Sequence, residues 1–132
     1  LVLAGAAVGL SIPTDDDRVR AAFEPGASPI DERLDALRRL HAAGVRTFAV
    51  VQPALPMDAA RLIDAVAPYV RAVRVDRMHA VERAEALYAR AGRLDAMDDG
   101  FADALVRALT EGFAARGVRV DALDDLAAAL DG

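Results

Sequence analysis

The sequence predicts an α/β protein in which single strands of a parallel sheet alternate with helices. Short runs of apolar and β-branched residues alternate along the chain with longer segments whose apolar residues recur every three or four positions. A strand, a helix and a second strand in that order form a right-handed βαβ unit, which makes neighbouring strands parallel. The length of 132 residues suffices for one core, so we expect a single domain.

Four apolar runs are predicted as strands: residues 8–12, 45–51, 70–76 and 118–120. The helix after the first strand has the clearest signals, because Ser28 can cap it, Pro29 suits its first turn and Gly44 can end it. Before this helix we expect a long polar loop over residues 11–27. Further helices are expected over residues 58–67, 81–91 and 99–116, and Asp121 is expected to cap a terminal helix within a helical C-terminal extension over residues 93–132.

Composition and charge exclude several classes of function. The net charge of −5 disfavours binding to duplex nucleic acid, and the aromatic content of 5% without tryptophan disfavours a base-stacking surface. The absence of cysteine excludes a disulfide framework and an iron–sulfur cluster held by this chain alone. The apolar N-terminus is ten residues long, whereas a spanning helix needs about 20, so we expect a cytoplasmic protein without a membrane partner.

The loops that follow the strands are the expected location of a site, because parallel sheets bind ligands beyond the carboxyl ends of their strands. Three loops qualify: residues 11–27, 52–57 and 76–80. The three consecutive acids at residues 15–17 are interpreted as a solvated loop or helix start. Glu24 lies in a turn where a carboxylate needs a partner, and Arg33 and Arg20 are both near enough in sequence.

Three residues at the end of the third strand have open interpretations. Asp76 and Arg77 could bind a polar ligand or could pair with each other or with a neighbouring loop. His79 follows the same strand, but a single histidine without a second ligand at metal spacing is a weak sign of catalysis or metal binding. A glycine-rich phosphate loop, a nucleophile elbow and a Ser/His/Asp grouping are all missing from the sequence.

Several short motifs suggest a more specific function than the composition and the predicted fold do. The chain carries SIPT at residues 11–14, EPG at 24–26, RL at 33–34, AG at 43–44, PALP at 53–56 and VRVDRMH at 73–79. In this order and spacing, these pieces resemble the radical S-adenosylmethionine superfamily, and most closely its spore photoproduct lyase-like branch.

The resemblance implies the second half of a partial (β/α)6 TIM-like barrel. In such enzymes a [4Fe-4S] cluster, held by a Cys-x3-Cys-x2-Cys loop, reduces bound S-adenosylmethionine to a 5′-deoxyadenosyl radical. This chain lacks the cysteine motif, so we expect a missing N-terminal half-barrel to carry the metal-binding cluster. The chain alone is then expected to be inactive, with S-adenosylmethionine as its cofactor and an unidentified substrate.

The resemblance also implies roles for particular residues. Ser11 would meet the cofactor's ribose with Thr14 beside it, and Gln52 with Pro53 would line the adenine. The next strand end would close over the adenine through Asp76, Arg77 and Met78. Glu24 and Arg33 are expected to brace the loop or to contact the ligand.

Two other interpretations remain open at the level of the sequence. One is a cysteine-free relative that persists as a non-catalytic binding or structural module. The other is an unrelated α/β domain, for example one that binds phosphate, in which the likeness of the loops is accidental.

Overall fold

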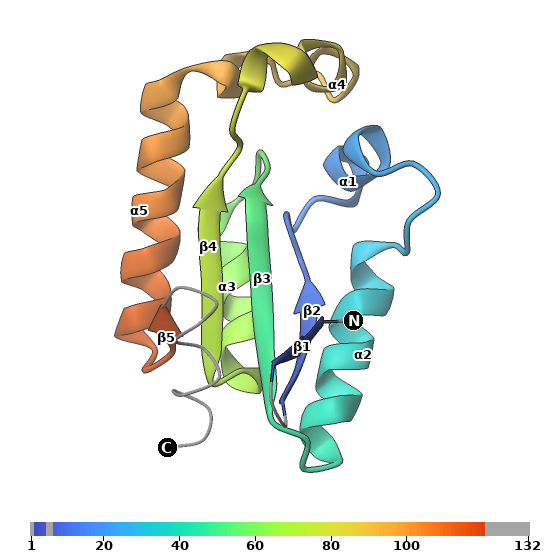
Figure 1. Cartoon of the computed structure of the whole chain (residues 1–132), viewed down its shortest axis with the longest axis vertical. Coiled ribbons are helices and arrows are strands. Elements are labelled where there is room, and N and C mark those ends of the chain that lie inside the picture. Colours follow the sequence, from blue (N-terminus) through green and yellow to red (C-terminus); the bar gives the residue numbers. More distant parts are fainter. Residues whose placement is uncertain (1, 5–6, 121–132) are drawn as a thin grey trace.

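The computed structural model describes residues 2–4 and 7–120 and shows a two-layer α/β fold (Figure 1). One layer is a five-stranded sheet in the order β1-β2-β3-β4-β5, and the other consists of helices. The strands are β1 (Val2–Ala4), β2 (Ala7–Ser11), β3 (Thr47–Ala54), β4 (Ala72–Arg77) and β5 (Arg119–Val120). Pairing from β2 to β5 is parallel, which confirms the predicted α/β class with parallel βα repeats.

Each of the strands β2, β3 and β4 is followed along the chain by one or more helices. After β2 come α1 (Asp17–Phe23) and α2 (Ile30–Ala42), and after β3 come α3 (Ala59–Val66) and the 3-10 turn η1 (Ala67–Tyr69). After β4 come η2 (Val81–Ala84), α4 (Glu85–Arg90), η3 (Leu94–Met97) and α5 (Asp99–Ala115). Among the described residues, no helix is both long enough and apolar enough to span a bilayer.

Helices α2, α3 and α5 cover one face of the sheet, where they form the main core. Leu37 of α2, Leu62 and Val66 of α3 and Leu109 of α5 pack on the strand residues that point to this face. The strand residues on that face are Leu10, Ala49, Val51 and Val73. Because side chains alternate along a strand, the residues between these ones lie on the opposite face of the sheet.

That opposite face, which we call the open face, carries no helix from α2, α3 or α5. Its lower part is a small apolar cluster of Ala7, Phe48 and Ala72, with Val50 packed against it. Towards the carboxyl ends of the strands its residues become polar and half-buried. The open face is therefore apolar at the amino ends of the strands and polar at their carboxyl ends. The polar end is a surface that a ligand could contact.

Two helix starts show how aspartates set the element boundaries. Asp58 Oδ1 accepts from the Arg61 N–H at 3.2 Å and caps α3 as predicted. The predicted cap of α2 by Ser28 is wrong, because Pro29 occupies the cap position without a side-chain hydrogen bond. Instead Asp17 Oδ1, from the preceding helix, accepts from the Ile30 N–H at 3.0 Å.

Several other expectations need correction. The segment 11–27 is not a plain loop, because it contains α1. The helix expected over residues 81–91 is divided into η2 and α4, and β1 pairs antiparallel with β2 although no strand was predicted there. The long helix α5 lies between β4 and β5, as predicted, and the helix expected after Asp121 lies outside the described residues.

Candidate functional site

The sheet register brings three predicted site residues to the same end of the open face. Ser11 of β2 pairs with Val50 of β3, and Val50 pairs with Arg74 of β4. Gln52 and Asp76 each lie two positions further along their strands, so their side chains lie on the same face as Ser11. The carboxyl ends of three neighbouring parallel strands therefore present a hydroxyl, an amide and a carboxylate to one surface.

Asp76 is the centre of the polar contacts at this surface. Its Oδ2 accepts from Gln52 Nε2 at 3.4 Å and lies 3.2 Å from His79 Nε2. Its Oδ1 accepts from the Arg77 backbone N–H at 2.8 Å. The carboxylate is thus oriented from three sides while its side chain stays 37% exposed.

The pKa of Asp76 is lowered from its ordinary value. Burial of the carboxyl group raises the pKa, but the hydrogen bonds from His79 and from the Arg77 N–H, with electrostatic attraction to His79 and Arg74, outweigh burial. Asp76 is therefore a carboxylate at neutral pH and acts as a hydrogen-bond acceptor. It also lines a hollow of about 330 Å³ between the end of β4 and α5.

Ser11 lies beside a second hollow, of about 490 Å³, at the end of β2. Arg33 lies across this hollow, donating from Nη1 to the Ser11 carbonyl at 3.0 Å and from Nη2 to Glu24 Oε1 at 2.8 Å. Both Arg33 and Glu24 line the hollow with Ser28. The Glu24–Arg33 pair fixes the turn after α1 against the end of β2 and leaves the Ser11 side chain half-exposed.

Thr14 lies in a different environment from Ser11. Its side chain is fully buried, and Oγ1 donates to the Pro56 carbonyl at 2.8 Å and accepts from the Asp16 N–H at 3.1 Å. Leu55 N–H also donates to the Pro13 carbonyl at 3.0 Å. These bonds join the loop after β2 to the loop after β3, so the Thr14 hydroxyl connects two loops.

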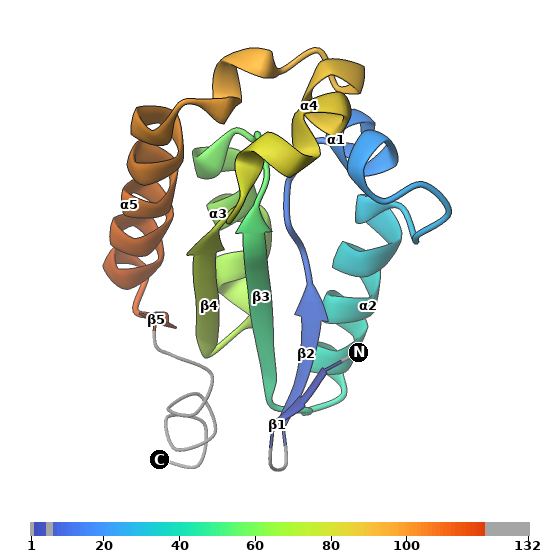
Figure 2. The same ribbon diagram turned by 45° about the horizontal axis from the view of Figure 1, so that its top comes forward.

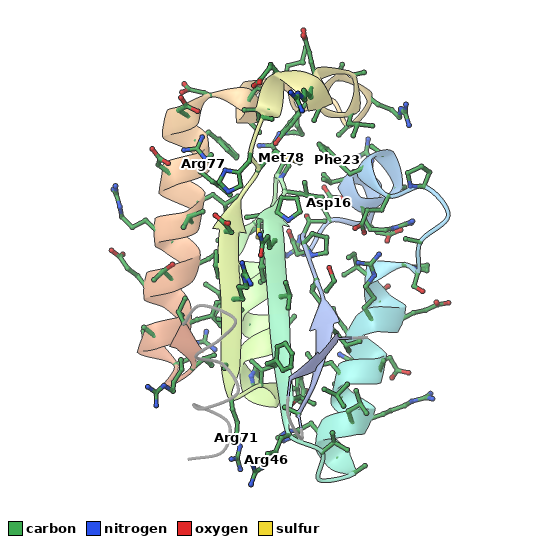
Figure 3. All side chains as sticks on the ribbon, in the orientation of Figure 1. Asp16, Phe23, Arg46, Arg71, Arg77 and Met78 are labelled. Atoms are coloured by element: carbon green, nitrogen blue, oxygen red, sulfur yellow. The ribbon has the colours of Figure 1, made fainter. Side chains whose placement is uncertain are left out.

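Arg77 and Met78 point away from the open face. Arg77 donates to Asp99 and Asp103 of α5 at 2.6 Å each, which raises its pKa, and Figure 3 shows it on the α5 side. Met78 packs with Phe23 in a separate apolar cluster above the sheet. Pro53 follows Gln52 at the end of β3 and is half-buried.

The separate cluster forms a roof over the carboxyl end of the sheet. Figure 2 shows α4 beside α1 above the strand ends, and the two helices meet through Phe23 and Tyr88, whose ring centroids are 4.9 Å apart in an edge-to-face arrangement. Tyr88 is 2% exposed, and burial raises the pKa of its hydroxyl group. Segments that follow β2 and β4 therefore meet above β3.

The acids at residues 15–17 have structural partners. Asp15 accepts from the Asp58 N–H at 2.8 Å, Asp16 caps α1, and Asp17 accepts from Arg20 at 3.0 and 3.1 Å. Within residues 2–4 and 7–120, there is no group of three or more His, Asp or Glu side chains arranged to hold a metal ion. These acids are used to start helices and to connect loops.

A further hollow, of about 180 Å³, lies at the amino ends of the strands, where Figure 3 marks Arg46 and Arg71. His41 and Tyr69 also line it, in edge-to-face contact at 5.6 Å. This hollow lies at the opposite end of the sheet from Ser11, Gln52 and Asp76.

Two residues near Asp76 were not assigned to the site from the sequence. Arg74 precedes Asp76 by two positions, and the period of two along the strand could have placed it on the same face. His79 was considered alone, because its contact with Asp76 depends on the course of the backbone from Asp76 to His79 beyond the end of the strand. The pair is visible only once that course is known.

Comparisons of the chain with models of protein families, with curated proteins and with solved structures give no match. Fold and site together define a parallel α/β protein with a polar surface at the carboxyl ends of β2, β3 and β4.

Proposed function

We propose that this chain is the C-terminal part of a radical S-adenosylmethionine enzyme and that its open face binds the adenosyl part of the cofactor. The observation that carries the proposal is the placement of Ser11, Gln52 and Asp76 on one face at the ends of adjacent parallel strands. These three are among the seven residues for which the resemblance to that family implies contact with the cofactor.

The donors and acceptors of this surface match an adenosyl group. A glutamine amide can both donate to and accept from the edge of an adenine ring, and the Asp76 carboxylate can accept from ribose hydroxyls or from an exocyclic amine. The Ser11 hydroxyl can do both. Val50 lies between the three as an apolar contact for the ring.

The strand order supports a partial barrel as the parent architecture. Parallel strands in sequential order with helices on one face are the arrangement of successive βα units in such a barrel. An N-terminal half would have to pair with β2 at the edge where β1 now lies antiparallel. The proposal therefore requires β1 to leave that edge in the longer protein.

The [4Fe-4S] cluster does not fit this chain, because the sequence contains no cysteine to bind its iron atoms. The role proposed for the chain is limited to binding and orienting the cofactor, and the chain alone is inactive. The partner is the missing half-barrel, and a reducing cytoplasm is the compartment that suits an iron–sulfur protein.

Ligand binding to this chain tests the proposal directly. We expect S-adenosylmethionine and S-adenosylhomocysteine to raise the melting temperature and to bind in calorimetry, whereas inorganic phosphate does neither. Gln52→Ala should weaken binding about tenfold, which corresponds to about 1.4 kcal/mol. Glu82→Gln, in the exposed η2 turn, is the control and should bind normally.

Three results would separate the interpretations. Binding of phosphate without S-adenosylmethionine would support an unrelated phosphate-binding domain and contradict the proposal. Equal affinity of Gln52→Ala and the wild type would contradict the assignment of the open face. A Cys-x3-Cys-x2-Cys motif in the reading frame upstream of Leu1 would support the enzyme, whereas a start codon immediately before Leu1 would support a cysteine-free binding module.

A further inference from the structure

We propose that His79 and Asp76 form a proton-transfer pair that activates a hydroxyl group, of water or of a bound ligand, at the open face. The inference goes beyond the binding of an adenosyl group and does not depend on it, because both residues and their contact belong to this chain alone. It rests on the orientation of each side chain and on the exposure of the imidazole.

The orientation of Asp76 is set before any ligand arrives. Gln52 and the Arg77 N–H hold its two oxygens, and Arg74 adds a positive charge nearby, so the carboxylate stays ionised. A fixed carboxylate next to an imidazole selects the tautomer with the proton on the nitrogen that faces it. Here that nitrogen is His79 Nε2, 3.2 Å from Asp76 Oδ2.

The other ring nitrogen of His79 then has its lone pair available. The side chain is 70% exposed, and within the described part of the chain its contact with Asp76 is its one polar contact. A carboxylate that orients an imidazole and stabilises the imidazolium is the arrangement by which general bases are built. Nδ1 of His79 is therefore positioned to accept a proton.

The backbone immediately after His79 has an unusual conformation. Ala80 has a φ of 53°, in the left-handed region that alanine rarely adopts, and its carbonyl accepts from the Arg83 N–H at 3.0 Å. The unusual residue therefore directly follows the imidazole in the chain. Left-handed residues other than glycine are concentrated at functional sites.

Hydrolysis of ethyl dichloroacetate provides a test with a defined probe, because its poor leaving group favours attack by water over attack by the imidazole itself. Nδ1 of His79 removes a proton from water as the water oxygen bonds to the ester carbonyl carbon. The carbon–oxygen bond to the leaving group then breaks, ethoxide leaves with the electron pair, and the imidazolium returns its proton to give ethanol. Water and the ester are the only reactants, and dichloroacetic acid and ethanol are the products.

The chain contains two histidines, so two single-histidine variants give a matched comparison. His41→Gln keeps only His79, and His79→Gln keeps only His41. We expect the variant that keeps His79 to hydrolyse the ester about tenfold faster and to react more slowly in D₂O than in H₂O, as general-base catalysis requires.

Asp76 is tested in the His41→Gln background. Asp76→Asn should remove most of the rate, and Asp76→Glu should restore part of it, with circular dichroism showing that both variants are folded. A purely structural role of Asp76 would not produce rescue by glutamate. Equal rates of the two single-histidine variants, an absent solvent isotope effect, or an unchanged rate in folded Asp76→Asn would each overturn the proposal.

Discussion

The ring of Phe48 lies against Gly9, its partner across β2 and β3, so closely that a Cβ atom on Gly9 would stand 2.3 Å from Phe48 Cε2. Phe48 is fully buried at the lower end of the open face. The glycine is required by this packing, because an aromatic ring cannot occupy the same volume as a methyl group.

The first prediction follows from this contact. Gly9→Ala should lower the free energy of unfolding by about 1–3 kcal/mol, as overpacking does in other cores. Gly112→Ala in α5 should cost less, because its closest contact is the flexible end of Ile63 and alanine favours the helix. Chemical denaturation measures both, and a Gly9→Ala variant as stable as the wild type would refute this account of Phe48.

The second prediction concerns the bond between the two loops. Thr14→Val keeps the shape of the side chain but leaves the Pro56 carbonyl without its donor, so stability should fall by about 1–3 kcal/mol. Thr110→Val, at a half-buried position of α5, serves as the control and should change stability little. A similar loss in both variants would show that the buried bond contributes nothing of its own.

The third prediction is a dependence on pH. The hydrogen bond from Arg20 and that from the Ile30 N–H lower the pKa of Asp17 from its ordinary value of 3.8. A carboxyl group with a depressed pKa in the folded state stabilises the fold above its ordinary pKa, and this stabilisation is lost as the pH falls through the folded value.

Asp17→Asn should therefore destabilise the protein at pH 7, and its deficit relative to the wild type should shrink as the pH falls below about 4. Asp31→Asn, in the first turn of α2, provides a comparison at an exposed position. Urea denaturation at several pH values measures the effect. A deficit that stays constant down to pH 2 would show that the Asp17 charge is not the cause.

The fourth prediction separates Arg77 from the ligand surface. Arg77→Gln removes two ion pairs to α5 and should lower the midpoint of urea denaturation slightly, with a smaller effect at high salt. Arg107→Gln, at an exposed position of α5 itself, is the control. Because Arg77 faces α5, S-adenosylmethionine should bind Arg77→Gln with wild-type affinity, and a large loss in calorimetry would place Arg77 at the ligand instead.

The fifth prediction concerns Ser11. Its carbonyl, not its hydroxyl, bonds Arg33, so Ser11→Ala should keep the fold and the Arg33 contact. The affinity for S-adenosylmethionine should fall by about threefold to tenfold, as expected for one hydrogen bond. Ser28→Ala, in the same hollow, should bind as the wild type does, and an equal loss in both would contradict a specific role for Ser11.

The sequence predicts the repeating part of this fold well, for identifiable reasons. The strands β2 and β3 contain apolar runs, β4 alternates apolar and polar residues, and α2 and α5 are long enough for their period of three and four residues to be clear. Helix α1 has only two turns, and its buried face includes Arg20, so it lacks that pattern.

The site is less accessible to sequence reasoning, because it depends on register. Gln52 and Asp76 meet only because β3 and β4 pair as they do, and the contact of His79 depends on how the backbone runs from Asp76 to His79 after the end of β4. The different orientation of Arg77 could be inferred from the alternation along β4. The buried bond of Thr14 could not, because its partner at Pro56 belongs to another loop.

The sequential order of the strands has a consequence for how the chain acquires its structure. Strands that are consecutive in the described chain are neighbours in the sheet, and each of the three parallel pairings joins two strands separated by one helical connection rather than by the whole chain. Topologies dominated by such near-neighbour contacts fold faster than those that join distant segments. During synthesis, β2 and β3 can associate as soon as α2 and β3 have left the ribosome, and each later unit adds to an existing edge.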